Sequence, residues 1–234
     1  MTPKYKHALI IGTGPGLSAS LARLFHANGM KVTLASRTVD DLTELAAETG
    51  AATHACDATD LAQVEALFAG LDGPDAPDVL VYNPAGRVAS DFVDLDPAAV
   101  RSAIDVTVMG CFYATQQAAK RMVPNGHGAI LITGASAGVK GYARSATFAM
   151  GNFARRGLTQ SLARELHPKG VHVGYFVIDG GIRNPLRPER IDQADNPDSM
   201  LCPDAIARTY WHFLQQDRSC WSWEIEVRPW VERF

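Results

Sequence analysis

The sequence predicts an α/β fold: a doubly wound parallel sheet of about seven strands, covered by helices on both faces in three α/β/α layers. Short runs of β-branched and aliphatic residues alternate with longer helical patterns along the whole chain. Several of these runs are continuously apolar, as expected for parallel strands that are buried on both faces. The 234 residues, 47% of them hydrophobic, suffice for one sizeable core, so we expect a single domain over 1–234.

The strand pattern and the helical pattern alternate without a repeat or a linker. Leu21, Leu24 and Phe25 lie on one face of the first predicted helix, and Gly29 and Gly50 are suitable residues to end the first two. The strict alternation implies right-handed crossovers. Strands are predicted over 8–11, 31–36, 52–56, 78–83, 129–134, 172–178 and 223–228, and helices over 18–29, 39–50, 60–69, 97–121, 145–167 and 203–216.

Composition excludes several classes of partner. The net charge is −3 and no basic block occurs, so we expect no nucleic acid partner. We also expect no membrane association, because no apolar run approaches the roughly 18 residues that span a bilayer and no secretory signal precedes the first strand. The 4 cysteines lack metal spacing and predict reduced thiols in a cytoplasmic protein. The 7 histidines show neither HxH nor HExxH spacing, so no metal site is expected.

The stretch "IIGTGPGLSASLA" follows the first strand and opens the first helix. Gly12, Gly14 and Gly16 let the backbone turn sharply and approach a ligand without a Cβ in the way. The helix that starts near Ser18 offers unpaired N–H groups and its positive dipole end to a pyrophosphate, and we include Leu17 among the contacts. This context predicts a dinucleotide-binding, Rossmann-type domain.

The end of the second predicted strand indicates which dinucleotide is bound. Enzymes that prefer NAD(H) usually have an acidic residue here to accept a hydrogen bond from the ribose 2′-hydroxyl, whereas this chain has Ser36 and Arg37. A guanidinium suits a 2′-phosphate. We therefore favour NADP(H) over NAD(H), against the alternative that Arg37 is a solvated residue at a strand end.

These motifs resemble those of the short-chain dehydrogenase/reductase family, and the resemblance runs nearly end to end. The family's G-x-x-x-G-x-G motif matches at Gly12 and Gly16, while Ser18 stands at the third glycine and adds a hydroxyl donor there. The family's Asp after the third strand, which contacts the adenine, matches Asp57, and Ala58 follows it. The resemblance thus implies contacts with the adenosine half of the cofactor.

Two further motifs of the family correspond to the nicotinamide half. Its Asn-Asn-Ala-Gly motif is similar to Asn83-Pro84-Ala85-Gly86, where Pro84 removes an N–H and holds Asn83 extended. Its Pro-Gly-x-Ile-x-Thr motif, which lies along the nicotinamide, is similar to 179–184 and retains Ile182. We therefore count Asn83, Ala85, Gly86 and Ile182 among the cofactor contacts.

The catalytic positions of the family are mostly substituted. The family uses a Tyr proton donor and a Lys four residues later, because a free phenol has a pKa near 10 and needs a nearby cation to lower it. It also uses a Ser that holds the substrate oxygen and an Asn that holds a relay water. The resemblance places Phe148, Asn152 and Thr107 at the Tyr, Lys and Asn positions. Ala135 falls at the Ser position, with Ser136 adjacent.

Two interpretations stay open. In the first, the chain is an oxidoreductase that transfers hydride to a small carbonyl, imine or enone substrate and takes its proton from a non-standard source. Tyr142 is the nearest candidate for that source, and Ser136 and Asn152 could hydrogen-bond a carbonyl oxygen. In the second, the chain is a catalytically silent NADP(H)-binding sensor or structural homologue of the family.

The substrate side of the site is predicted from two further features. Ala135, Phe148 and Met109 flank the expected nicotinamide position and predict an apolar pocket. The segment 183–203 is rich in Pro, Asp and Asn and follows a strand, so we expect a substrate loop or lid there, with a plain surface excursion as the alternative.

The C-terminal stretch carries Trp221, Trp223 and Trp230. In the family that it resembles, the last strand helps to build a subunit interface, and aromatic residues suit such surfaces. We therefore expect a homodimer or homotetramer, against the alternative of a core strand with a packed tail.

Overall fold

The computed structural model describes residues 5–184, 186–192 and 194–232, and within them the chain forms one parallel sheet. The strands lie in the order β3-β2-β1-β4-β5-β6-β7, and every neighbouring pair is parallel. The predicted doubly wound α/β fold is confirmed, and each strand begins and ends within one residue of its predicted bounds. The strands are β1 His7–Ile11, β2 Lys31–Ser36, β3 Ala52–Ala55, β4 Val79–Tyr82, β5 Gly128–Thr133, β6 Val171–Ile178 and β7 Glu224–Val227.

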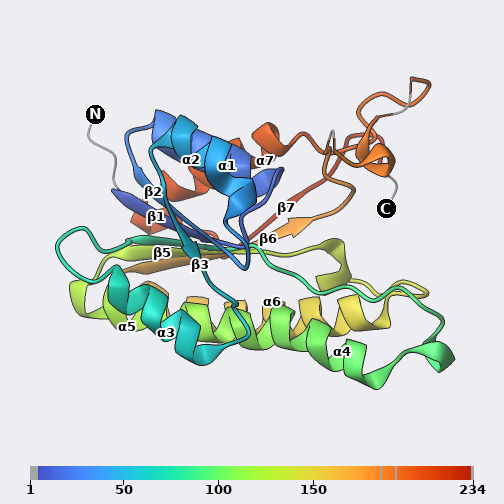
Figure 1. Cartoon of the computed structure of the whole chain (residues 1–234), viewed down its shortest axis with the longest axis horizontal. Coiled ribbons are helices and arrows are strands. Elements are labelled where there is room, and N and C mark those ends of the chain that lie inside the picture. Colours follow the sequence, from blue (N-terminus) through green and yellow to red (C-terminus); the bar gives the residue numbers. More distant parts are fainter. Residues whose placement is uncertain (1–4, 185, 193, 233–234) are drawn as a thin grey trace.

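Helices cover both faces of the sheet. Figure 1 shows α1, α2 and α7 on one side and α3, α4, α5 and α6 on the other, so the predicted three layers are present. The first group comprises α1 Leu17–Ala27, α2 Thr43–Thr49 and α7 Pro203–Leu214. The second group comprises α3 Leu61–Gly70, α4 Pro97–Ile104, α5 Gly110–Asn125 and α6 Ala146–Leu166.

The strands in the middle of the sheet are buried along their whole length, which explains their continuous apolar sequences. Side chains alternate between the two faces, so Ile10 packs in one core cluster while Leu9 and Ile11 pack in the other. On α1, Leu21 and Phe25 are fully buried against the first cluster, as the helical pattern predicts. The sheet is thus fixed from both sides by apolar burial.

The predicted helix 97–121 is interrupted by a π-helical turn. The structure extends the helical region to Asn125 and places the π-helical turn Asp105–Met109 between α4 and α5. Thr107 lies in this turn, and its Oγ1 accepts a hydrogen bond of 2.8 Å from the backbone N–H of Gly86. Such turns often occur at functional sites. Here the turn fixes the motif that follows β4.

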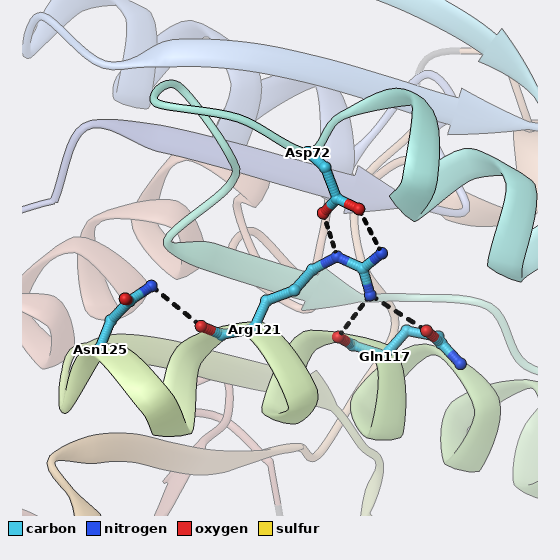
Figure 2. A network of polar contacts seen from close by, with 4 residues as sticks. All are labelled: Asp72, Gln117, Arg121 and Asn125. Atoms are coloured by element: carbon cyan, nitrogen blue, oxygen red, sulfur yellow. Dashed lines mark hydrogen bonds and ion pairs between the residues drawn. The ribbon is translucent and has the colours of Figure 1, made fainter.

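A polar network joins α5 to the loop after α3. Arg121 of α5 donates to both carboxylate oxygens of Asp72, at 2.5 and 2.9 Å. Figure 2 shows these two contacts as dashed lines. The same guanidinium donates to the backbone and side-chain oxygens of Gln117, and Asn125 donates to the carbonyl of Arg121. Hydrogen bonds from Arg121 lower the pKa of Asp72. The pair is partly solvated, so we expect it to orient the two helices more than to stabilise them.

The strand order changes direction between β1 and β4. The chain runs outward from β1 through β2 to β3, and then outward on the other side from β4 to β7. In open α/β sheets, ligands bind at the carboxyl ends of the strands at such a switch point. Gly12 follows β1 and Asn83 follows β4, so both lie at this place.

Candidate functional site

Two adjoining cavities open at the carboxyl ends of the strands. Arg87 and Arg187 line both of them. The first, which we call the glycine-loop cavity, has a volume of about 710 Å³. Its lining includes Gly12, Ser36, Arg37, Asp57, Ala58, Ala85 and Gly86. The second, which we call the Ser136 cavity, has a volume of about 680 Å³. Its lining includes Gly16, Leu17, Asn83, Ser136, Tyr142, Phe148 and Ile182. The structure thus brings together most of the residues singled out in the sequence.

The start of α1 suits a pyrophosphate. Its N-cap residue, Gly16, supplies no side-chain hydrogen bond, so the first N–H groups of the helix lack a side-chain cap. Gly16 and Leu17 line the Ser136 cavity, and a Cβ added at Gly14 or Gly16 would meet no heavy atom within 4 Å in the described part of the chain. Uncapped amides beside open space are the feature that binds phosphate at helix N-termini. Gly14 itself lines neither cavity within the described residues.

Hydrogen bonds of Ser18 and Asn83 fix the glycine loop at Gly12. Gly12 adopts a φ of 83°, and an added Cβ there would lie 2.6 Å from the ring of Pro84. The Ser18 hydroxyl donates to the carbonyl of Gly12 at 3.0 Å and accepts from Asn83 Nδ2 at 2.7 Å. The sequence suggested that the Ser18 hydroxyl donates to the phosphate. Ser18 is buried, so its hydroxyl instead supports the glycine loop.

Arg37 and Asp57 lie at the far end of the glycine-loop cavity. The Asp57 carboxylate accepts from the backbone N–H and the hydroxyl of Thr59, at 2.9 and 2.8 Å, and these bonds fix its orientation. Arg37 is exposed, and within the described ranges no carboxylate lies within ion-pair distance of it. Its guanidinium is therefore available to a ligand that enters this cavity.

Phe148 and Asn152 lie one turn apart on α6, but only Phe148 reaches the Ser136 cavity. The Arg87 guanidinium lies over the Phe148 ring, 5.4 Å from its centre. Asn152 is fully buried, and its amide donates back to the carbonyl of Phe148 at 2.8 Å. The sequence-based suggestion that Asn152 holds a substrate oxygen is therefore wrong for this geometry. Thr107 is also buried and bonded to Gly86, away from both cavities.

A buried arginine, Arg155, contacts the Asn152 side chain, and nothing in the sequence singled it out. Its side chain donates to the carbonyl of Pro84 and to Oδ1 of Asn152, both at 2.8 Å. Its Nε has no hydrogen-bond partner, and no carboxylate of the described residues forms an ion pair with it. The neighbouring Arg156 instead pairs with Glu224. The sequence "ARR" carries no signal that the first arginine turns inward and the second outward.

Residues 134–145, between β5 and α6, form what we call the Ser136 loop, which contains a polar cluster. The Tyr142 hydroxyl donates to Ser136 Oγ at 2.8 Å, and Lys140 Nζ lies 5.6 Å from the centre of the Tyr142 ring. Lys140 also contacts the buried carboxylate of Asp179 at 3.4 Å, and Arg228 lies 3.6 Å from the same carboxylate. The hydrogen bond with Tyr142 and then the charge of Asp179 raise the pKa of Lys140. Sequence spacing predicted Ser136 and Tyr142, but not Lys140 or Asp179.

The prediction of an apolar pocket is right only in part, because Ala135 and Phe148 line the Ser136 cavity together with charged side chains. Arg87, Arg187 and Arg190 line the Ser136 cavity together with Phe148, whereas Met109 is outside its lining. Arg187 and Arg190 come from the segment after β6, about a hundred residues from Arg87. Local sequence around Phe148 could not show which distant side chains would join it.

A sequence model described as short chain dehydrogenase matches residues 6–193. The chain belongs to the short-chain dehydrogenase family. A galactitol 2-dehydrogenase (L-tagatose-forming) of Cereibacter sphaeroides is 31% identical over 194 residues, which cover 78% of this chain and 76% of that protein. An uncharacterised oxidoreductase of Staphylococcus aureus strain N315 is 29% identical over 238 residues, covering 96% and 97% of the two chains.

Solved structures agree with this membership. A short-chain dehydrogenase from Rhodopseudomonas palustris superimposes with a TM-score of 0.82 at 29% identity, covering 96% of this chain and 99% of that one. A metagenomic short-chain oxidoreductase, solved in complex with NADP, has a TM-score of 0.83 at 23% identity and covers 99% and 100% of the two chains. The second likeness shows the shared fold alone. This chain therefore has the short-chain dehydrogenase fold, and Ser136, Tyr142 and Phe148 line its Ser136 cavity.

Two features are absent from the part of the chain that the structure describes, a membrane-spanning helix and a cluster of metal ligands. Across 5–184, 186–192 and 194–232, none of the helices combines the length and apolarity that crossing a bilayer requires. In the same part of the chain, we find no group of three His, Cys, Asp or Glu side chains placed to hold a metal ion.

Proposed function

We propose that this short-chain dehydrogenase binds NADP(H) and reduces or oxidises a small carbonyl, imine or enone substrate, with Tyr142 and Ser136 moving the proton. The observation that carries the proposal is the 2.8 Å hydrogen bond from Tyr142 to Ser136 in the lining of the cavity. It replaces, from a loop, the phenolic donor that Phe148 on α6 cannot supply.

The residues proposed to hold the cofactor are divided between the two cavities. The free amides at Gly16 and Leu17 would take the pyrophosphate, and Asp57, in a fixed orientation, would take the adenine side. Arg37, which forms no ion pair within the described part of the chain, would take a ribose 2′-phosphate. When bound, the nicotinamide supplies the hydride. Asn83 and Ile182 line the Ser136 cavity, where the hydride would be exchanged.

The direction of the Tyr142–Ser136 bond suggests a relay. Tyr142 donates to Ser136 Oγ, so the Ser136 hydroxyl is left free to donate to an oxygen in the cavity. In carbonyl reduction, Ser136 would pass its proton to the substrate oxygen and receive the phenolic proton of Tyr142. Lys140, anchored by Asp179, would stabilise the phenolate that remains. In the oxidation direction the same protons would move in reverse.

We propose that 183–203 acts as a lid over this site. Both ends of the segment are tied together, because the backbone N–H of Leu201 donates to Gly181 and that of Arg183 donates to Leu201. Arg187 and Arg190, between these ties, line the Ser136 cavity. Residues 185 and 193 of the predicted lid lie outside the described residues.

We further propose a cytoplasmic homodimer or homotetramer with one domain per chain. Phe112 of α5 and Met150 and Phe153 of α6 are large apolar side chains exposed on the outer helical layer, which supports burial against a second copy. Trp223 stacks under Arg156, and Trp230 is exposed. The buried thiols of Cys56 and Cys111 have raised pKa values of about 11 and about 12, as expected for inert reduced cysteines.

The test has two stages. The first is a fluorescence titration of the protein with NADPH and NADH. The second is a screen of carbonyl, imine and enone substrates with the preferred nucleotide, followed by Tyr142→Phe and the matched control Tyr113→Phe. We expect tighter binding of NADPH, and a loss of about 100-fold or more in kcat for Tyr142→Phe only. Turnover that is unchanged in Tyr142→Phe would exclude the relay.

The competing proposal is a catalytically silent NADP(H)-binding protein. It is favoured by the contacts of Asn152 and Thr107. Both side chains form hydrogen bonds inside the protein and lie outside the lining of the Ser136 cavity. Tight binding of NADPH with no turnover across the whole screen would favour this second function. No binding of either nucleotide would exclude both.

A further inference from the structure

The Ser136 cavity carries an excess of positive charge. Arg87, Arg187 and Arg190 line it, and the carboxylates in its lining are Asp179 and Glu232. Asp179 already has two cations of its own, Lys140 at 3.4 Å and Arg228 at 3.6 Å. The three lining guanidinium groups therefore face the single remaining carboxylate of Glu232.

Among the residues that the structure describes, none of these three arginines takes part in a direct ion pair. Within the described ranges, no carboxylate oxygen lies within 4.0 Å of a side-chain nitrogen of Arg87, Arg187 or Arg190. Other arginines of the same chain do have such partners, including Arg183 beside them, which pairs with Asp192. Unpaired guanidinium groups around a concave site are positioned for an anionic ligand.

Two of the three contact different parts of the Ser136 cavity lining, Arg87 at Phe148 and Arg190 at Gly181. Arg87 lies over Phe148, at the position where the family places its proton donor. Arg190 lies against Gly181, where an added Cβ would be 2.9 Å from its Nη1, and it lines only the Ser136 cavity. Arg87 and Arg187 line both cavities, but only Arg87 lies over the Phe148 ring, so we leave Arg187 to the cofactor phosphates. Arg87 and Arg190 thus remain for the substrate.

We propose that the substrate carries an anionic group, a carboxylate or a phosphate, and that Arg87 and Arg190 bind it. This proposal rests on the proposed oxidoreductase function, because it places the reacting carbonyl of the same molecule beside Ser136. A planar guanidinium presents paired donors that match the two oxygens of a carboxylate or phosphate. The ring of Phe148, under Arg87, presents an apolar face for the short carbon chain between the two groups.

The experiment measures binding, so that it does not depend on turnover. Protein loaded with NADPH is titrated in a calorimeter with pyruvate and levulinate, with their methyl esters, and with the phosphonates that replace each carboxylate. The same titrations are done with Arg87→Gln, with Arg190→Gln and with Arg208→Gln, a control on the exposed side of α7. The ketone is common to all ligands, so any difference between acid and ester reports the anionic group.

We expect at least one acid to bind, its ester to bind much more weakly, and each cavity variant to lose about 10- to 100-fold in affinity for the acid. Arg208→Gln should bind as the wild type does. A preference for the phosphonate over the carboxylate would identify phosphate as the group. Equal binding of acids and esters, acid binding that survives both cavity substitutions, or no binding of any anion would overturn the proposal.

The anion-site proposal and the oxidoreductase proposal can fail independently of each other. If NADPH does not bind, the oxidoreductase proposal fails, and the same acids are then titrated into the protein without nucleotide. Acid binding that still requires Arg87 and Arg190 would support the anion site alone. Acid binding that is independent of both would overturn it.

Discussion

Arg155 donates a hydrogen bond from Nη2 to Oδ1 of Asn152 over 2.8 Å, and the two side chains are only 1% and 0% exposed. In the family, the position of Asn152 carries the lysine that activates the tyrosine. This chain instead has a neutral acceptor there and a buried guanidinium beside it. The resemblance implies that Asn152 replaces the lysine, so we infer that this replacement and the burial of Arg155 belong to one arrangement.

Restoring the family's pair should fail without a change at Arg155. In the double variant Phe148→Tyr with Asn152→Lys, the new ammonium group would meet Arg155, and the guanidinium would lose its amide acceptor. We expect the free energy of unfolding to fall by about 3 kcal/mol or more, measured by urea denaturation. Adding Arg155→Met should recover much of this loss and raise carbonyl reduction. Arg155→Met alone serves as the control, and a double variant as stable as the wild type would contradict the argument.

Arg37 should decide the preference between the two nucleotides. Arg37→Ala removes a charge-assisted hydrogen bond to a 2′-phosphate, so we expect about 10- to 100-fold weaker binding of NADPH and little change for NADH. Fluorescence titration measures both constants, with Arg208→Ala as the matched control. An equal loss for the two nucleotides would show that Arg37 contacts a part that they share.

Lys140 should stabilise the Ser136 loop at neutral pH and lose that effect in strong alkali. Its hydrogen bond with Tyr142 and the charge of Asp179 raise the pKa of Lys140. A raised pKa means that the contribution is complete below the unfolded-state pKa of about 10.4 and disappears as the pH rises through the higher folded-state value. The Tm difference between the wild type and Lys140→Met should therefore be constant from neutral pH upward and shrink in this alkaline range. A difference that shrinks at neutral pH would contradict the assignment.

His7 should make the protein sensitive to mild acid. Burial lowers the pKa of His7, whose Nδ1 donates to the carbonyl of Asp75 and whose Nε2 accepts from the Thr33 hydroxyl. Protonation of Nε2 would remove that acceptor. The unfolded state therefore binds the proton more readily, and the contribution of His7 to stability falls as the pH drops below about 6.5. Urea denaturation should show a decline below that pH that is smaller in His7→Gln, and equal declines would exclude His7 as the cause.

The exposed apolar face of α5 and α6 should be an interface between copies of the chain. Phe153→Glu places a charge on this face, so we expect it to lower the oligomeric state in sedimentation velocity while the protein stays folded. Phe92→Glu is a matched control, because Phe92 is exposed in a separate short helix before α4. A change in assembly with Phe92→Glu but not with Phe153→Glu would move the interface away from α5 and α6.

The fold could be read from the sequence because its signals are local. Continuous apolar strands, helices with one apolar face and the glycine turn after β1 each depend on residues close together in the chain. The same local signals predicted the residues at the strand ends, such as Gly12, Arg37 and Asn83, because parallel strands bring their carboxyl ends to one edge of the sheet. The family resemblance then indicated which catalytic groups are substituted.

Only the tertiary structure decided what replaces them. The inward turn of Arg155, the contact of Lys140 with Asp179 and the placement of Arg87 over Phe148 each bring together groups from distant segments of the chain. A charged residue in a sequence has no periodic pattern that tells whether it faces solvent or a buried partner. A charged side chain is buried only where its hydrogen bonds offset the free-energy cost of removing the charge from water. Both quantities are set by the packing of distant parts of the chain.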